Sequence, residues 1–369
     1  MKRPTHIFLC LVFTAFFSVA AIALANQSFK TKDLEGTWES NSLATGPGSP
    51  WWERGSYLIQ DDGSFTGTST DSNGSNQNLS GTFHISPTGI VTISIGADPI
   101  DPTFQGALDA GKTIMVATDT WDGGYQTGTS ELKVFTKMGP AYSQEDLAGT
   151  WEVNSLASGP GAPWWLRGSV TVNADGSFSG TLNESNGTQD NVSGILHISN
   201  KGIITSQDIN KDFRAVMDSG KTVFVGTATW GDGTTYISIW LKRGSQYSTH
   251  DLAGTWQINS LASGPGAPWW ERGSITIGSD GSFSGILEES DGNQDSVSGS
   301  IDISSDGIIT SQNIDPDFRA VMDSDKSIIV GTATWDEWKP GTTYISIWIK
   351  TGQRDIATNF PWLLLLLGD

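Results

Sequence analysis

The residues best suited to contact a ligand are tryptophans in a segment that the chain contains three times. Gly-Pro-Gly-(Ser/Ala)-Pro-Trp-Trp occurs at Gly46–Trp52, Gly159–Trp165 and Gly264–Trp270. Its two prolines fix φ, so the segment is stiff and extended. Two successive residues of an extended chain point to opposite faces. One indole of each pair can therefore enter a core while the other faces solvent.

An arginine follows each tryptophan pair by two residues, on the side of the second tryptophan, where its guanidinium can stack on the indole. Another tryptophan lies near the end of a late strand in each copy. These groups could form an aromatic platform for a sugar or a flat apolar ligand, or they could only close one end of a barrel. The candidate ligand-binding residues are Trp52, Arg54, Trp121, Trp165, Arg167, Trp230, Trp270, Arg272 and Trp335.

Motifs for catalysis are lacking in the sequence. It contains no Gly-x-Ser-x-Gly, His-Glu-x-x-His, phosphate-binding loop or dinucleotide fingerprint. None of its histidines has a second histidine, cysteine or acid at a ligand spacing, so we expect no metal site and no cofactor. We expect a protein without enzymatic activity, although a pair of carboxylates could hydrolyse a substrate without any sequence motif.

The charge balance is strongly acidic. Against 40 acidic residues stand 21 basic ones, giving a net charge of −19. Such a chain repels phosphate backbones, so nucleic acid is not an expected partner.

The first 25 residues have the pattern of a secretory signal peptide. A basic start is followed by the apolar run Ile7–Ala20 and the small residues Ala23–Ala25. The run is too short for a comfortable transmembrane span, so we expect no span in the mature chain. Cleavage would also remove Cys10, the only cysteine. We therefore expect an exported protein, periplasmic, cell-surface or extracellular, without disulfides.

Internal repetition dominates the remaining chain. Asp33–Trp38 recurs at Asp146–Trp151 and at Asp251–Trp256, with Gly-Thr-Trp at the end of each copy. We expect three modules joined by short linkers, as beads on a string. The predicted division is residues 1–25 as the signal peptide, 33–139, 146–244 and 251–352 as the modules, and 353–369 as an apolar tail.

Within each copy the hydrophobic period is two, which is typical of strands. Ile345, Ile347 and Ile349, for example, alternate with other residues, and turn signals such as Asp280-Gly281 separate such runs. About eight hairpin-linked strands in roughly a hundred residues can close into an antiparallel up-and-down β-barrel, which removes both sheet edges. The predicted fold class is therefore all-β, with three such barrels in tandem. A β-sandwich module is the alternative.

Short motifs in each copy resemble those of lipocalin- and avidin-like barrels, the calycin type. They are the Gly-Thr-Trp opening, the segment Gly176–Thr181, and the tryptophan-bearing segments Thr227–Trp230 and Ile237–Leu241. The resemblance implies a barrel that could enclose a cavity.

The same resemblance implies how the barrel is closed. In lipocalins the tryptophan of this motif packs at one barrel end against a basic side chain from a late strand. Lys242 or Arg243 would serve Trp151, and Lys137 would serve the first copy.

The tail contains Phe360–Leu367, which ends in five leucines and is too short to cross a bilayer. It could contact a protein or surface partner.

These features together favour an exported, non-enzymatic tandem-repeat protein that binds a carbohydrate or small apolar ligand through Trp/Arg-rich barrel rims. Three copies would raise avidity. The alternatives are a structural or adhesive cell-surface spacer and a carboxylate-dependent hydrolase.

Overall fold

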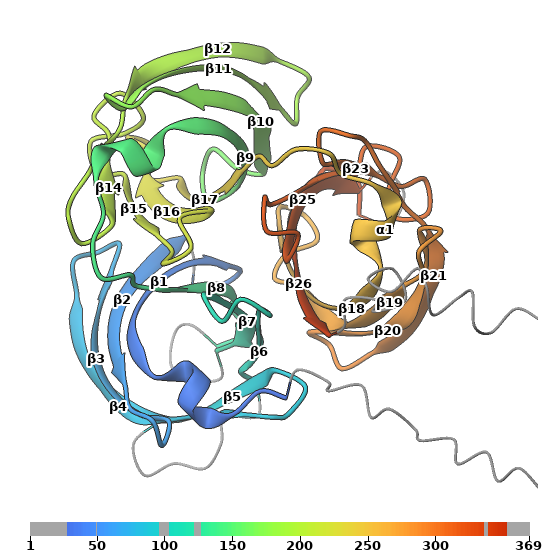
Figure 1. Cartoon of the computed structure of the whole chain (residues 1–369), viewed down its shortest axis with the longest axis horizontal. Coiled ribbons are helices and arrows are strands. Elements are labelled where there is room, and N and C mark those ends of the chain that lie inside the picture. The colour runs from blue at the N-terminus through green and yellow to red at the C-terminus, as the bar shows by residue number, and fades with distance from the viewer. Residues whose placement is uncertain (1–27, 49, 96–102, 122–126, 336–338, 353–369) are drawn as a thin grey trace, which may run out of the picture.

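The computed structural model describes residues 28–48, 50–95, 103–121, 127–335 and 339–352. Antiparallel strands form nearly all of its regular structure, arranged as three modules (Figure 1), so the predicted all-β class is confirmed. The proposed signal peptide (1–25) and apolar tail (353–369) lie outside the described residues. Within the described part of the chain, no helix has the length and hydrophobicity needed to span a membrane.

The first module is a closed eight-stranded barrel. Each strand pairs with the next, and the last strand returns to pair with the first. In that closing pair Trp38 lies opposite Lys137. The elements are η1 (Thr31–Leu34), β1 (Gly36–Thr45), β2 (Trp51–Ile59), β3 (Ser64–Asp71), β4 (Asn76–Ile85), β5 (Ile90–Ile95), β6 (Gln105–Leu108), β7 (Ile114–Thr120) and β8 (Ser130–Lys137).

The second module is a curled nine-stranded sheet with the same path. Its two edges, β12 and β13, follow one another in the chain with only Leu196 between them. The Asp208 carboxylate accepts the Ile195 N–H at 2.8 Å, so a side chain bridges the gap in the wall. The elements are η3 (Gln144–Leu147), β9 (Gly149–Ser158), β10 (Trp164–Val172), β11 (Ser177–Glu184), β12 (Gln189–Ile195), β13 (His197–Ile198), β14 (Ile203–Thr205), β15 (Arg214–Met217), β16 (Val223–Thr229) and β17 (Thr235–Lys242).

The third module repeats this arrangement. Ile301 separates its edge strands β21 and β22, and the Asn313 side chain accepts the Ser300 N–H at 2.9 Å across the gap. The elements are α1 (Thr249–Leu252), β18 (Gly254–Ser263), β19 (Trp270–Ile277), β20 (Ser282–Glu289), β21 (Gln294–Ser300), β22 (Asp302–Ile303), β23 (Ile308–Thr310), β24 (Arg319–Met322), β25 (Ile328–Trp335) and β26 (Thr342–Gly352).

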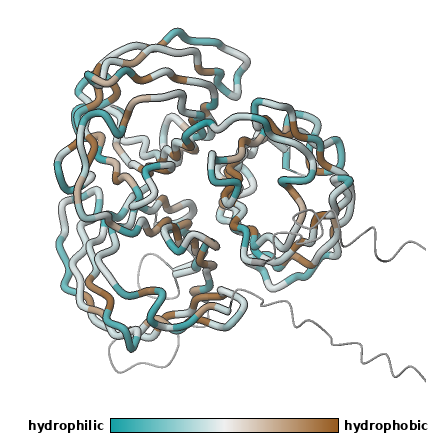
Figure 2. Tube along the Cα trace, viewed as in Figure 1, coloured by the Kyte–Doolittle hydropathy of each residue, from teal (hydrophilic) through white to brown (hydrophobic). Residues whose placement is uncertain are grey.

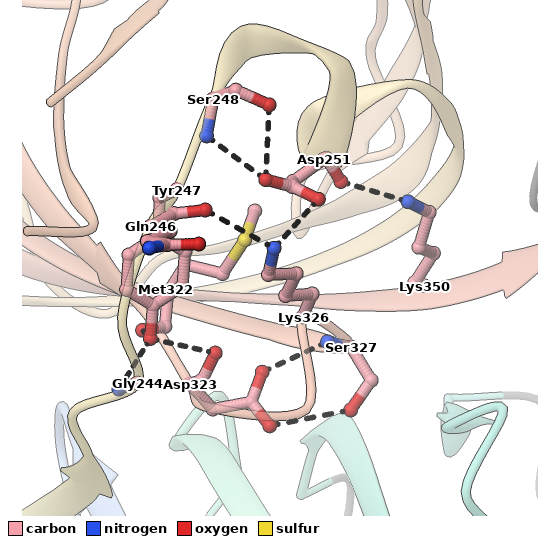
Figure 3. Close-up of polar contacts among 10 residues, drawn as sticks. All are labelled: Gly244, Gln246, Tyr247, Ser248, Asp251, Met322, Asp323, Lys326, Ser327 and Lys350. Carbon is pink, nitrogen blue, oxygen red and sulfur yellow. Dashed lines mark hydrogen bonds and ion pairs between the residues drawn. The ribbon is translucent and has the colours of Figure 1, made fainter. Parts of the chain in front are cut away.

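One end of each barrel is closed by the tryptophan of the Gly-Thr-Trp motif. Trp256 is fully buried, and its indole N–H donates to Leu252 O at 2.7 Å. The Lys350 ammonium lies 5.2 Å from the indole centroid and donates to Asp251 O (Figure 3). Lys326, also drawn there, pairs with the Asp251 carboxylate at 2.9 Å.

The other two barrels are closed in the same way. Lys137 lies over Trp38 and Lys242 over Trp151, at 5.4 and 5.5 Å from the indole centroids. This is the packing that the lipocalin resemblance implies. Of the two basic residues considered for Trp151, Lys242 is the one that fills the role.

The outward face of the last strand in each barrel is apolar. In β26, Tyr344 and Trp348 belong to the barrel interior, whereas Ile345, Ile347 and Ile349 point outward. Burying outward-facing isoleucines requires a second apolar surface, because exposed apolar area is unfavourable at roughly 25 cal/mol per Å². The neighbouring modules supply that surface.

The three modules therefore share one apolar core, called here the central cluster, on which hydrophobic segments converge (Figure 2). The sequence left open whether the modules touch, and the structure packs them together as a ring. The central cluster consists of Leu43, Ala107, Ile114, Val116, Leu132, Val134, Leu156, Val223, Val225, Ile237, Ile239, Leu241, Leu261, Val321, Ile328, Val330, Ile345, Ile347 and Ile349.

Backbone hydrogen bonds also link the modules in a cycle, from the second module to the first, from the third to the second and from the first to the third. In each, the N–H of a residue in the turn that precedes the second-last strand of a barrel donates to the carbonyl of a barrel-closing lysine in another module. The pairs are Ser219 with Lys137 (2.8 Å), Ser324 with Lys242 (2.9 Å) and Ala110 with Lys350 (3.0 Å).

The central cluster should contribute directly to stability. Leu156→Ala, which removes a fully buried side chain from it, should lower the free energy of unfolding by about 2–5 kcal/mol. Leu58→Ala, at a site 50% exposed on β2, is the matched control and should change it by no more than about 0.5 kcal/mol. Chemical denaturation measures both. Equal small effects would mean that the modules do not depend on their shared core.

Candidate functional site

The second tryptophan of each pair lies between modules, enclosed by protein. These three indoles are only 7%, 5% and 4% exposed in chain order. Each indole N–H donates to a threonine hydroxyl of another module, in cyclic order. The pairs are Trp52 with Thr229 (2.8 Å), Trp165 with Thr334 (2.8 Å) and Trp270 with Thr120 (2.6 Å).

The arginines stack on these indoles as predicted, with guanidinium carbons 3.8, 4.0 and 4.2 Å from the indole centroids in chain order. Their N–H groups reach backbone carbonyls of the same neighbouring module. Burial is the main cause that lowers the pKa of Arg54 and Arg167 to about 10. The bonds run from Arg54 to Thr227 O (2.6 Å) and Asp212 O (2.8 Å), from Arg167 to Thr332 O (2.8 Å) and Asp317 O (2.9 Å), and from Arg272 to Thr103 O (2.6 Å).

These six candidates therefore do not form the expected solvent-facing platform. The sequence left open which indole of each pair points outward. The structure places the second one on the outer side of its barrel, and in the ring that side faces the next barrel. The glycine-proline segments meet there too. A Cβ built on Gly159 would lie 2.7 Å from the Pro50 ring, and one on Gly264 equally close to Pro163. Trp–Arg stacking and Gly–Pro contact thus belong to the module interface.

The late-strand tryptophans lie apart from these interface residues, at the barrel mouths. Trp121 packs edge-on against Trp51, with centroids 5.6 Å apart, and Trp335 packs likewise against Trp269 at 4.8 Å. Trp230 contacts Tyr236 and is 45% exposed. The first tryptophan of each pair, which was not among the candidate residues, therefore lies at the barrel mouth together with the late-strand tryptophan.

A cavity of about 440 Å³ occupies the third barrel, a size typical of small-molecule sites. Its wall includes residues near the edge strand β21, where the sheet is bridged by Asn313. Its polar wall contains three carboxylates, Glu271, Glu289 and Asp315. Its aromatic lining consists of Trp269, Phe283, Phe318, Trp335, Tyr344 and Trp348.

The carboxylates in this cavity differ in their partners. Asp315 accepts a 2.6 Å hydrogen bond from the Tyr344 phenol. Glu271 is half-buried, and burial together with the nearby Glu289, Asp295 and Asp315 raises its pKa to about 8. Burial is also the main cause that raises the pKa of Glu289. The third cavity therefore gathers several acidic groups, and Lys339 lies near enough to Glu289 to oppose the rise of its pKa.

The first barrel carries its own cation at the equivalent place. Lys133 on β8 lies 2.8 Å from Glu53 and 3.4 Å from Glu131. Burial alone would lower the Lys133 pKa, but the two glutamates raise it well above its ordinary value. Ser42 is the register partner of both Glu53 and Lys133. This barrel thus balances its interior charge with its own lysine.

Strand register identifies the equivalent residues of the other barrels. In the third, Ser260 pairs with Glu271 and Ser346, so glutamate is kept and serine replaces the lysine. In the second, Ser155 pairs with Leu166 and Ser238, so both charges are absent. At these two equivalent positions the first barrel therefore has glutamate and lysine, the second has leucine and serine, and the third has glutamate and serine.

Sequence analysis did not identify Glu271 or Ser346 as site residues. Their signal is a difference among copies that are otherwise alike: Trp-Trp-Glu-Arg becomes Trp-Trp-Leu-Arg in the second copy. Of the nine residues that were proposed, only Trp335 lines the third cavity. Among the described residues, no cluster of three histidine, cysteine or acidic side chains is arranged to hold a metal ion.

Comparisons with known proteins add little to this picture. The sequence matches no protein-family model and no curated protein. In structure, the chain is similar to isotype 1 transferrin binding protein B from serogroup B Neisseria meningitidis, with 11% identity and a TM-score of 0.29, over 82% of this chain and 66% of that one. The chain therefore spans about two thirds of that protein's length.

Two further structures have comparable likeness. A mutant transferrin binding protein B from Haemophilus parasuis has 10% identity and a TM-score of 0.29, over 87% of this chain and 76% of that one. A protein of unknown function from the DUF3598 family of Nostoc punctiforme has 10% identity and a TM-score of 0.21, over 58% and 99%. Likeness at these TM-scores carries no argument about function.

The interface role of the second tryptophan can be tested at Trp165. Trp165→Ala should lower the free energy of unfolding by about 3–5 kcal/mol, because it empties a buried site between modules and leaves Arg167 without its stacking partner. Trp230→Ala is the control, since that indole is 45% exposed, and it should change stability little. Denaturant unfolding provides the measurement. A Trp165→Ala protein as stable as the wild type would contradict the interface role.

The environment of Glu271 predicts a pH dependence. Its pKa is about 8 in the folded protein against an ordinary 4.5, so the folded state retains a proton that the unfolded chain releases between these values. Its contribution to stability is therefore full below pH 4.5 and is lost as the pH rises through 8. Glu271→Gln should remove this loss and be more stable than the wild type at pH 8.5, by at least about 1 kcal/mol.

Thermal unfolding of both proteins at pH 5 and pH 8.5 measures the effect of Glu271. Buried acids outside the cavity titrate equally in both proteins, so the difference between them reports Glu271 together with its coupling to Glu289, Asp295 and Asp315. Glu53→Gln is the matched control and should destabilise at both pH values, because it removes a partner of the buried Lys133. An identical pH profile for Glu271→Gln and wild type would refute the assignment.

Proposed function

We propose that the protein is an exported, non-enzymatic binding protein that holds a small ligand inside its third barrel. The observation that carries this proposal is the cavity of about 440 Å³ lined by aromatic side chains and carboxylates. Aromatic walls with a few directed polar groups are typical of ligand sites. Export rests on the signal-peptide pattern of residues 1–25.

The differences between the interiors of the three barrels support this proposal. The central cluster and the Trp–Arg contacts have the same chemistry in each module, as expected of residues that hold the ring together. The barrel interiors differ at the Glu53, Leu166 and Glu271 positions. This difference in interior charge favours a binding role for one barrel and supporting roles for the others.

Binding is favoured over hydrolysis by the state of the carboxylates. A carboxylate-dependent hydrolase needs one acid and one base placed on opposite sides of the scissile bond. Asp315 is instead engaged by the Tyr344 phenol at 2.6 Å, an arrangement suited to fixing a wall of the site. The carbohydrate or small apolar ligand expected from the sequence remains the ligand class for a first panel, moved from the rims to the interior.

A cavity-filling variant tests the proposal. Ser346→Leu should occupy the cavity and abolish ligand-induced changes in tryptophan fluorescence, because Trp269, Trp335 and Trp348 line the same space. The test uses a panel of saccharides, small apolar molecules and amines. Ser238→Leu makes the same change in the second barrel and should leave binding unchanged. A panel in which no compound alters the fluorescence, or one in which both variants respond as the wild type does, would refute the proposed site.

A further inference from the structure

We propose that the third-barrel cavity binds a primary ammonium group, with Glu271 as its counter-ion, in the place that the Lys133 side chain takes in the first barrel. The inference rests on the binding function proposed above and names the chemical class of its ligand. A small alkylamine, a polyamine end or a lysine side chain of a partner would present the required group.

The strand register carries the first step of the argument. Glu53 and Lys133 flank Ser42 across three neighbouring strands, and their charged atoms lie 2.8 Å apart. Glu271 and Ser346 flank Ser260 in the same way. The third barrel thus has the glutamate of the pair but serine in place of the lysine, so it lacks the four methylenes and the ammonium of Lys133.

The cavity beside Glu271 and its acidic neighbours provide the second observation. Glu271 and Ser346 both line the cavity, and the Ser346 hydroxyl accepts the Trp348 indole N–H at 2.8 Å, so an entering ammonium would lie between this indole and Glu271. The described charged groups that influence Glu271 are all acidic: Glu289, Asp295 and Asp315. With a pKa of about 8, Glu271 is largely protonated in the empty cavity at pH 7. An incoming ammonium would favour its ionised form and offset the repulsion from the neighbouring acids.

The aromatic wall is the third step. Trp335 packs against both Trp269 and Tyr344, with centroids 4.8 and 5.7 Å apart, and all three line the cavity. Indole and phenol faces attract cations, most strongly where water is excluded. A wall of rings beside carboxylates suits an organic cation with an apolar stem.

A bare metal ion fits the cavity less well. Within the described residues, the carboxylates are not grouped closely enough to form a three-ligand metal site. An alkylammonium needs only one or two carboxylates at its head, and its stem can pack on the rings. The geometry therefore points to an amine.

A tethered ammonium tests this without knowledge of the natural ligand. Ser346→Lys should recreate the Glu53–Lys133 pair with Glu271 and raise the melting midpoint by at least about 2 °C. In a Glu271→Gln background the same lysine should lose this gain, and a double-mutant cycle measures the coupling. Ser238→Lys, which faces Leu166, is the matched control and should lower the midpoint. Destabilisation by Ser346→Lys to the same extent, regardless of residue 271, would overturn the inference.

A free ligand provides the second test. n-Butylammonium reproduces the lysine side chain and should bind at pH 7 with a Kd on the order of 1 mM or lower, by tryptophan fluorescence and calorimetry. Its neutral analogue 1-butanol should bind at least about tenfold more weakly, and butyrate should not bind. Glu271→Gln should weaken n-butylammonium binding about tenfold or more, whereas Glu184→Gln, an acid-to-amide change at the second-barrel counterpart of Glu289, should not.

The outcomes separate the two proposals. Equal binding of 1-butanol and n-butylammonium would overturn the ammonium inference while supporting a cavity for neutral ligands. Failure of n-butylammonium to bind would also overturn it, and the Ser346→Leu panel would then decide the binding function independently.

Discussion

The structure depends on one constraint, which is that the outward face of the last strand of each barrel is apolar. One face fills the barrel, and the other would be exposed if the module stood alone. Ile345, Ile347 and Ile349 lie with their counterparts from the other modules in the central cluster. Because each module presents the same kind of face, three of them can satisfy one another by closing into a ring.

In the ring, the aromatic and cationic groups have two different structural roles. Outside each barrel, the Trp–Arg stacks and their bonds to threonines and carbonyls of the next module hold neighbours in register. Inside, the Gly-Thr-Trp indole and its lysine close one end, and aromatic residues line the other. Since the interface is shared by all three modules, its residues are constrained alike, whereas the interior of a single barrel is free to change. That freedom is visible in the charge balance around Lys133, Leu166 and Glu271.

Local features of the sequence predicted a large part of this architecture. Period-two hydrophobicity and Asp-Gly turns depend on neighbours in the chain, so they indicated strands and hairpins correctly. The two-residue spacing between each second tryptophan and its arginine predicted the stacking, because alternate residues of a strand share a face. The closure of Trp151 by Lys242 agrees with the lipocalin resemblance. By contrast, solvent exposure of the second indoles was expected and is not found, since exposure depends on what lies beyond the module.

The sequence by itself therefore determined the strand-forming repeats, their turns and the pairing of side chains within a strand, because these follow from backbone geometry over a few residues. Only the tertiary structure decided that the modules pack as a ring and that Glu271 faces a cavity. Both facts arise from residues far apart in the chain: the central cluster joins strands of all three modules, and the third-barrel site appears only when β18 aligns Glu271 with Ser346. The serine at position 346 becomes chemically informative only once the strand pairing shows that it shares a register position with Glu271.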